Sequence, residues 1–234
     1  MSPLSPRATV VQQSPLFAGI SLPDCSNIVS STHEKRFSRG QTIFAQGDPV
    51  RQIVLLVSGC VKLMQVGRDG SEVILRLTGS GEIVGTLGLG TEGEHSSSAQ
   101  TKESSVALVW DMADFGSALE RFPMFRRNLS RVLEVRLAEM DERFREVSTE
   151  KVGSRLSSQL VRLSNQVGKR VDGNVKISLS RAELAQLIGT TLFTVSRLLR
   201  QWETRGIVGN RRKCVLLHDL TALEGLSREE AEAA

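Results

Sequence analysis

The chain has 234 residues, of which 40% are hydrophobic and 24% charged, proportions typical of a folded globular protein and not of a disordered one. No apolar run approaches the roughly 20 residues of a membrane-spanning helix, and the first 13 residues lack the apolar core of a secretory signal. The three cysteines, Cys25, Cys60 and Cys214, are too widely spaced for a disulfide framework or a four-thiolate metal site. We therefore expect a cytoplasmic protein in a reducing environment, with no membrane partner.

The formal charge of +4 is unevenly distributed along the chain. Residues 1–150 hold 16 basic and 18 acidic residues, whereas residues 151–218 hold 13 basic and 3 acidic ones. Residues 219–234 hold 1 basic and 5 acidic residues and are interpreted as an acidic tail. A net charge of +10 within 68 residues produces a field that attracts polyanions. Residues 151–218 are therefore predicted to bind nucleic acid.

From about His33 to Asp111 the sequence is typical of an all-β domain. Short runs of branched residues alternate with glycines, roughly one glycine at each turn. Strands at this spacing indicate a sandwich or barrel rather than a parallel sheet. Ahead of them, Ser21 predicts a helix N-cap, with Pro23 and Asp24 in the first turn. The expected strands are Thr42–Ala45, Gln52–Ser58, Val61–Val66, Glu72–Leu77 and Ser105–Trp110.

The apolar period changes to that of a helix between Pro123 and Val147. Five apolar residues are separated there by steps of 4, 3, 4 and 3, the a/d spacing of a coiled coil. A second set, Leu129, Val132 and Val135, can face the β domain. Two stripes indicate two packing surfaces, so we expect the first stripe to form a dimer seam; packing on a core of the same chain is the alternative. The seam residues are Leu133, Leu137, Met140, Phe144 and Val147.

Two short helices are predicted further on, over Arg181–Ile188 and Leu192–Thr204. Ser180 and Glu183 form a capping box at the start of the first helix. Gly189 ends that helix as a C′ glycine. Two helices joined by a glycine-containing turn of this length form a helix-turn-helix.

The helix-turn-helix is flanked by elements that complete a winged domain. A helix near Lys151–Gln166, a polar turn at Gly168–Asn174 and a strand-like run at Val175–Leu179 precede it. After it, Ile207-Val208 and Lys213–Leu217 are predicted to pair as a β-hairpin, with Gly209–Arg212 as the turn and a run of three cations at the tip. Such a hairpin is the wing of a winged helix-turn-helix.

This order of parts resembles the CRP/FNR family of bacterial transcription regulators, from about Pro15 to His218. Three segments carry the resemblance in the family's order and spacing. They are Gly81–Leu89, Thr149–Gly153, and Ser180–Leu199 with its Thr194-Val195-Ser196-Arg197 core.

The resemblance implies an α+β fold in three parts. Residues 15–121 are expected to form a β-roll (double-stranded jelly roll) sensor domain, residues 122–147 a long dimerisation helix, and residues 148–218 a C-terminal winged helix-turn-helix domain, followed by the acidic tail 219–234. It also implies a homodimer on double-stranded DNA at a pseudo-palindromic operator. RNA polymerase is a further partner if the protein is an activator, and the small-molecule effector is left unidentified.

The resemblance also assigns DNA-reading positions. Arg197 matches the arginine that relatives aim at a guanine, and Ser196 precedes it as in the FNR branch. Leu192 and Phe193 stand where relatives often carry Arg-Glu or Val-Glu. The usual acceptor for a cytosine amino group is therefore missing, and the two apolar side chains could meet thymine methyl groups instead. The other expected DNA contacts are Arg181, Thr191, Thr194, Arg200, Arg211, Arg212 and Lys213.

The effector pocket departs from the cyclic-AMP-binding branch of the family. That branch uses a glutamate for the ribose and an Arg-Ser pair for the phosphate, but here Thr86 and Ser97-Ser98 occupy these positions, after a one-residue insertion. A buried phosphate without its cation loses a charge-assisted contact, which argues against cyclic AMP, although Arg76 could supply a substitute cation. The expected pocket residues are Arg76, Gly85, Thr86, Leu87, Gly88, Ser97, Ser98, Ser148 and Thr149.

Other sensing chemistries and functions stay open beside this interpretation. A haem-dependent or redox-dependent gas sensor of the same fold could use His33, His95 or Cys60 as an axial ligand, or oxidise Cys60 or Cys25. The iron–sulfur cluster of the FNR branch lacks its N-terminal group of cysteines here. A cyclic-nucleotide-binding regulatory protein would share the β-roll but would not need the basic helix-turn-helix. No P-loop, Gly-x-Ser-x-Gly or His-Glu-x-x-His motif is present, so neither an enzyme nor a metal site is expected.

Overall fold

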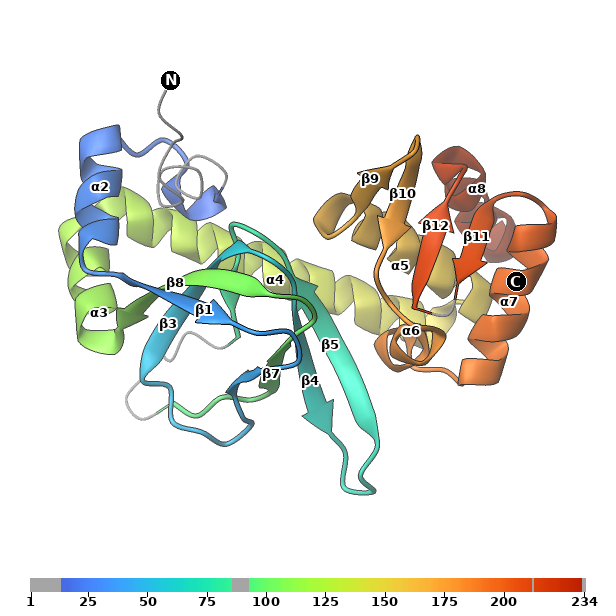
Figure 1. Cartoon of the computed structure of the whole chain (residues 1–234), viewed down its shortest axis with the longest axis horizontal. Helices are drawn as coiled ribbons and strands as arrows, with labels where there is room; N and C mark the ends of the chain where they lie inside the picture. The colour runs from blue at the N-terminus through green and yellow to red at the C-terminus, as the bar shows by residue number, and fades with distance from the viewer. Residues whose placement is uncertain (1–13, 86–92, 212, 233–234) are drawn as a thin grey trace. The chain divides into compact units, whose positions relative to one another are not determined.

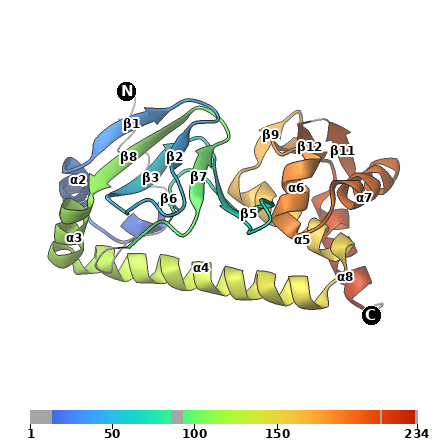
Figure 2. The ribbon, with the colours of Figure 1, turned by 90° about the horizontal axis from the view of Figure 1, so that it is seen from below.

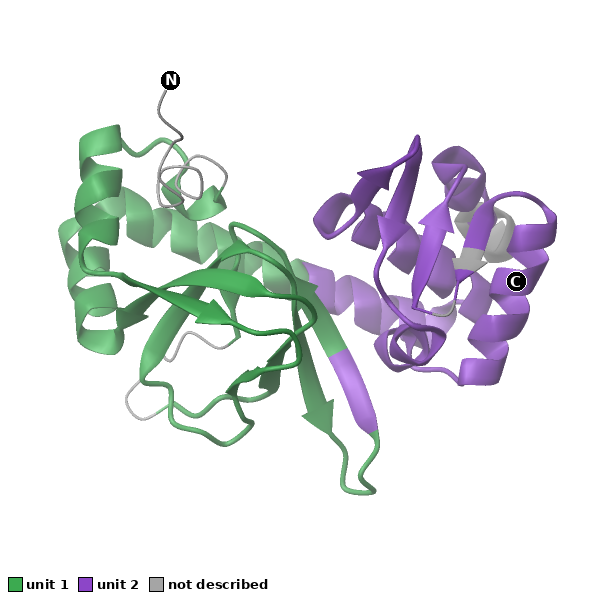
Figure 3. Cartoon of the chain, viewed as in Figure 1, with its two compact units in different colours: residues 1–71, 75–138 green, residues 72–74, 139–234 purple. Residues whose placement is uncertain are grey.

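The computed structural model describes residues 14–85, 93–211 and 213–232. The chain folds into two compact units, one made of Met1–Ser71 and Leu75–Ala138 and the other of Glu72–Ile74 and Glu139–Ala234 (Figure 3). One unbroken helix, α4 (Pro123–Thr149), contributes to both units (Figure 2).

The first unit is built around two four-stranded sheets whose strands pair in the orders β1-β8-β3-β6 and β2-β7-β4-β5 (Figure 1). The predicted β-roll is thereby confirmed, and two of the five expected strands have the predicted bounds. The strands are β1 (His33–Phe37), β2 (Thr42–Phe44), β3 (Gln52–Ser58), β4 (Val61–Val66), β5 (Glu72–Thr78), β6 (Ile83–Val84), β7 (Ser98–Thr101) and β8 (Ser105–Asp111).

The apolar run in β3 is explained by burial on both faces of the strand. Successive side chains of a strand point to opposite faces. Ile53 and Leu55 pack in a core on the helical side of the sheet, together with Trp110, whose Nε1 donates to the Ile28 carbonyl at 3.0 Å. The alternate residues of β3 pack inside the roll. The core inside the roll consists of Phe37, Val54, Leu56, Val61, Leu63, Val84, Ala99, Ala107 and Val109.

Helices cover the outer face of β3 and β8. As predicted, Ser21 caps α2, and its side chain accepts from the Asp24 amide at 3.2 Å. The side chain of Asn128 in α4 donates to the Leu16 and Ala18 carbonyls at 2.9 and 2.8 Å, which holds the start of the described chain on this helix. These helices are η1 (Pro15–Phe17), α2 (Leu22–Ser30), α3 (Met112–Arg121) and the first part of α4.

The second unit contains the predicted helix-turn-helix with its predicted bounds. The Ser180–Glu183 capping box is present, and Gly189 ends the first helix in the left-handed conformation at φ 65°. Thr191 caps the second helix by accepting from the Thr194 amide at 3.2 Å. The elements are α5 (Val152–Gln166), β9 (Lys169–Val171), β10 (Asn174–Ile177), α6 (Arg181–Ile188), α7 (Leu192–Thr204), β11 (Val208–Arg211), β12 (Cys214–Leu217) and α8 (Leu220–Glu232).

The wing forms as predicted, but its turn lies later in the chain. β11 runs through Gly209 and pairs with β12 up to Arg211 opposite Cys214, so the prediction of a turn at Gly209 was wrong. A Cβ atom at residue 209 would lie 2.7 Å from Nε2 of His218, so glycine here permits a close approach within the sheet and not a turn. The predicted polar turn at 168–174 likewise contains a strand, β9, which pairs with β10.

The residues interpreted as an acidic tail form the amphipathic helix α8. Leu223 and Leu226 are buried, and the Ser157 hydroxyl of α5 donates to the Leu223 carbonyl at 2.9 Å. The segment was not predicted as a helix because its interpretation rested on its net negative charge and not on its apolar residues. Across the described parts of the chain, no helix combines the length and the apolar character that crossing a membrane requires.

Candidate nucleic-acid interface and effector site

One face of α7 is buried and fixes the helix on the second unit. Its opposite face is open: 83% of Phe193 and 44% of Leu192 are exposed. Arg197 and Arg200 are also exposed, and their spacing of three places them on one side of the helix. The helix therefore presents apolar groups and cations together, the combination that can contact thymine methyls, guanines and phosphates. The buried residues of α7 are Val195, Leu198, Leu199 and Trp202.

Four exposed cations of α7 and the wing have no carboxylate partner among the described residues. Among the described residues, no ion pair involves Arg197, Arg200, Arg211 or Lys213. Arg211 and Lys213 flank the wing turn, whereas Arg212 lies outside the described residues. The positive charge expected from the sequence is therefore available to an anionic partner.

Of the remaining predicted DNA contacts, Thr191 is exposed and the others are half-buried. The Thr191 hydroxyl caps α7 and also lies 3.0 Å from that of Thr194. Thr194, Ser196 and Arg181 are half-buried. Thr191 therefore has a structural task that the sequence-based assignment did not separate from a DNA contact.

The two stripes of α4 have different surroundings in the single chain. Leu129 is buried and Val132 packs against the core of the first unit. Val135 is 59% exposed, so the expectation that it faces the β domain was wrong. At 3.6 residues per turn it lies about 120° around the helix from Leu129. The seam residues are all exposed, by 39% at Leu133, 59% at Leu137, 67% at Met140, 76% at Phe144 and 57% at Val147.

Arg136 is a residue of this region that the sequence-based assignment missed. Its guanidinium donates to the Ile83 carbonyl at 2.5 Å and to the Gly85 carbonyl at 3.4 Å. It lies one helical turn after Val132, and this placement on the inward face was the available signal. Arg136 therefore ties α4 to the chain immediately before the predicted effector loop.

The predicted effector pocket is only partly assembled by the described residues. Arg76 pairs with Glu82 at 3.1 Å, and Glu82 also accepts from the Gly79 amide at 2.7 Å, so the candidate substitute cation already has a counter-ion. Ser97 is buried, and the Ser98 hydroxyl accepts from the Gln46 amide at 2.9 Å. Thr86, Leu87 and Gly88 lie outside the described residues.

The other described residues of the predicted pocket are Gly85 and, in α4, Ser148 and Thr149. Gly85 has a φ of +77°, and a Cβ atom there would lie 2.3 Å from Cζ of Phe44. Ser148 and Thr149 belong to the second unit and donate to the Phe144 and Arg145 carbonyls, both at 2.8 Å. Their participation in an effector pocket stays a prediction.

The candidate haem and redox residues belong to different segments of the first unit and differ in burial. Cys25 is buried, and burial, with a smaller contribution from Asp24, raises the pKa of its thiol. Cys60 is half-buried and His33 is exposed on β1. No three His, Cys, Asp or Glu side chains converge into a possible metal site within the described ranges. Of the candidate axial ligands, His95 is the buried one.

A partly buried ion pair joins the end of α4 to α5. Glu146 is 5% exposed and its carboxylate accepts from both terminal nitrogens of Arg162, at 2.5 and 2.7 Å. Gln159 accepts from Arg162 at 3.1 Å and from Arg143 at 3.0 Å. This network fixes α5, the first helix after α4, against the last turns of α4 within the second unit.

Comparisons with known proteins agree with this architecture. Residues 34–122 match the model of the cyclic nucleotide-binding domain, and residues 154–226 match that of the Crp-like helix-turn-helix domain. The chain is 33% identical to the cyclic AMP receptor protein of Thermus thermophilus, over 83% of this chain and 88% of that one. It is 27% identical to the CRP-like cAMP-activated global transcriptional regulator of Mycobacterium tuberculosis, over 94% of this chain and 99% of that one.

Solved structures give the same result. The catabolite activator protein of Thermus thermophilus superposes with a TM-score of 0.54 at 31% identity, covering 93% of this chain and 100% of that one. FixK2 of Bradyrhizobium japonicum superposes with a TM-score of 0.74 at 20% identity, over 83% and 96%, a likeness of fold alone. The chain therefore belongs to the CRP/FNR family of transcription regulators.

Proposed function

We propose that this protein is a sequence-specific DNA-binding transcription regulator that acts as a homodimer and responds to an effector other than cyclic AMP. The observation that carries the DNA-binding role is the outward face of α7. Arg197 and Arg200 are exposed there without a protein counter-ion among the described residues, beside the exposed ring of Phe193. In this proposal Arg197 reads a guanine in the major groove, and Arg211 and Lys213 hold the phosphate backbone.

The homodimer is supported by the seam residues of α4. Five large apolar side chains at coiled-coil spacing are exposed on one stripe of a 27-residue helix, and monomeric proteins rarely leave such a stripe open. A dimer two-fold axis along this stripe supplies the symmetry with which paired recognition helices read a pseudo-palindrome.

The case against cyclic AMP rests on the charge of the predicted pocket. Cyclic AMP is the ligand printed in the names of the Thermus and Mycobacterium relatives, and it is therefore the first effector to test. In this chain the only arginine of the expected pocket, Arg76, is neutralised by Glu82, and the Ser98 hydroxyl already accepts from Gln46. Capture of a cyclic phosphate would have to break the Arg76–Glu82 pair at a cost in free energy.

Substitution of Arg197 tests the base-reading role. We expect Arg197→Ala to cost about 1–3 kcal/mol of operator affinity and to flatten the preference at one base pair of each half-site. The matched control, Arg211→Gln, should weaken binding to all sequences alike and reduce the salt slope by about 1 for each phosphate that is no longer neutralised. Fluorescence anisotropy with single-base operator variants at several salt concentrations measures both effects. Full selectivity in Arg197→Ala would contradict the assignment of α7.

Charges placed in the seam test the dimer. Each large apolar side chain buried there contributes roughly 1.5–3 kcal/mol, so the double variant Leu137→Asp with Met140→Asp should sediment as a folded monomer. Ala138→Asp, which adds one charge at an exposed position beside the stripe, should remain dimeric. A dimer that persists in the double variant counts against this seam.

Calorimetry tests the exclusion of cyclic AMP. We expect no heat of binding at micromolar ligand and no change in operator affinity, because the pocket offers no free cation for the phosphate. Cyclic GMP, which carries the same phosphate, should behave in the same way. Micromolar binding that raises DNA affinity severalfold would overturn the prediction and indicate that Arg76 leaves Glu82 when the nucleotide binds.

A further inference from the structure

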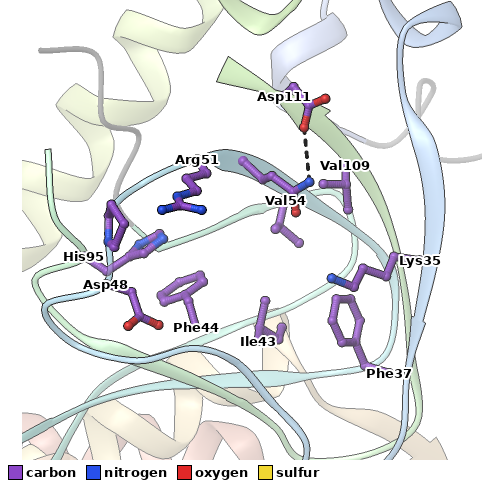
Figure 4. Close-up of a pocket in the computed structure, with 12 residues that line it drawn as sticks. Lys35, Phe37, Ile43, Phe44, Asp48, Arg51, Val54, His95, Val109 and Asp111 are labelled. Atoms are coloured by element: carbon purple, nitrogen blue, oxygen red, sulfur yellow. Dashed lines mark hydrogen bonds between the residues drawn. The ribbon is translucent and has the colours of Figure 1, made fainter. Parts of the chain in front are cut away.

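The β-roll contains a cavity of about 620 Å³ that is separate from the predicted effector pocket (Figure 4). Its volume lies in the usual range for small-molecule sites, about 300–1,000 Å³. None of the described residues expected in the effector pocket lines it. We call it the β-roll cavity. Its lining consists of Lys35, Phe37, Ile43, Phe44, Asp48, Pro49, Arg51, Gln52, Val54, His95, Val109 and Asp111.

The β-roll cavity offers two cations to a ligand. Within the described chain, neither Lys35 nor Arg51 pairs with a carboxylate. The two carboxylates of the lining already have partners, because Asp111 accepts from the Gln52 amide at 3.1 Å and Asp48 from the Ala45 backbone amide at 2.8 Å. The lining therefore holds two acidic side chains that accept hydrogen bonds and two basic side chains without an ion pair among the described residues, of which Lys35 has its Nζ 5.4 Å from the centroid of the Phe37 ring. An anion that reached either cation would gain a charge-assisted hydrogen bond.

The wall of the cavity carries a polar atom without a partner. His95 is 5% exposed, and its Nδ1 accepts or donates no hydrogen bond among the described residues. Its ring stacks on Phe44 with 3.5 Å between centroids (Figure 4). Burial lowers the pKa of His95 against an opposing effect of Asp48, so the ring is neutral at pH 7. A buried unpaired polar atom costs about 1–3 kcal/mol, and a ligand oxygen or amide could satisfy it.

We propose that the β-roll cavity binds a small organic carboxylate with an apolar body. The carboxylate is held by Arg51, beside which His95 supplies a further hydrogen bond, and Lys35 adds a second positive charge across the cavity (Figure 4). The body packs on the apolar part of the lining, Phe37, Ile43, Phe44, Val54 and Val109. The identification of this carboxylate as the effector rests on the proposed function, whereas the binding site itself does not.

Phe44 connects the β-roll cavity to α4 through a chain of contacts. Phe44 lines the cavity, and its ring also reaches Gly85, where a Cβ atom would lie 2.3 Å from Cζ. The Gly85 carbonyl in turn accepts from Arg136 of α4. A ligand that shifts Phe44 therefore acts on the residue that Arg136 holds. It biases the regulator only by its difference in affinity for the two states of the dimer.

Nuclear magnetic resonance of the full chain tests the site, with His95 as the internal reporter. The probes are 2-naphthoate and octanoate, each beside its neutral amide. We expect at least one carboxylate to shift the His95 imidazole signals at millimolar concentration and to bind about tenfold more tightly than its amide. The double variant Arg51→Gln with Lys35→Gln should lose this preference but bind the amide within about twofold. Arg51→Lys should keep part of the preference, and Arg39→Gln, an exposed arginine outside the cavity, should keep all of it.

Three results would overturn the proposal: no shift of the His95 signals with either carboxylate, a preference that survives in the double variant, or an equal loss in Arg39→Gln. Operator affinity measured in parallel separates this outcome from failure of the proposed function. Carboxylate binding that leaves operator affinity unchanged would overturn the effector role of the ligand. Carboxylate binding by a protein that shows no Arg197-dependent DNA binding would instead overturn the proposed function while the site stands.

Discussion

The structure depends on one helix, α4, that presents two apolar stripes to two different surfaces. The first part of α4 buries Phe125 and Leu129 against the core of the β-roll, while the seam residues on another stripe stay open in the single chain. A helix with a single apolar face could close the roll or face a second copy, but not both. Arg136, one turn after Val132 on the inward face, holds the Ile83 and Gly85 carbonyls.

Charged side chains of the described chain are paired in contacts within the protein and unpaired on the candidate ligand-binding surfaces. Glu146 and Arg162 form a partly buried pair whose hydrogen bonds are largely satisfied by each other and by Gln159. Loss of Arg162 would leave the buried Glu146 carboxylate uncompensated. Cations on α7, on the wing and in the β-roll cavity, by contrast, have no carboxylate partner among the described residues. Unpaired positive charge therefore marks both candidate ligand surfaces.

Sequence patterns predicted those elements whose ends are encoded locally. Ser180, Glu183 and Gly189 determine the ends of α6 through its own backbone, so its bounds followed from the sequence. β1 was not predicted as a strand because four of its five residues are exposed and polar, and its place depends on pairing with β8. α8 was not predicted because its many acidic residues indicated a tail, although its apolar residues pack on α5.

The β-roll cavity could not be predicted because its lining comes from segments far apart in the sequence. Lys35 and Arg51 are unremarkable as sequence positions, and His95 was considered only as a haem ligand. Pairing of β1, β3 and β8 brings Lys35 and Arg51 to one space, and backbone hydrogen bonds of His95 with Gly47 and Asp48 bring His95 there. The Arg76–Glu82 pair could not be predicted for a related reason, because the sequence alone does not show which carboxylate lies beside Arg76.

The central claim is that two copies of α7, related by the symmetry of α4, read one DNA site together. Selection of binding sites from random duplex DNA by the full chain tests it most directly. We predict an enriched pseudo-palindrome whose half-sites are centred about one helical turn apart, roughly 10–10.5 base pairs. Enrichment of a single unpaired half-site, or of no sequence above the starting pool, would contradict it.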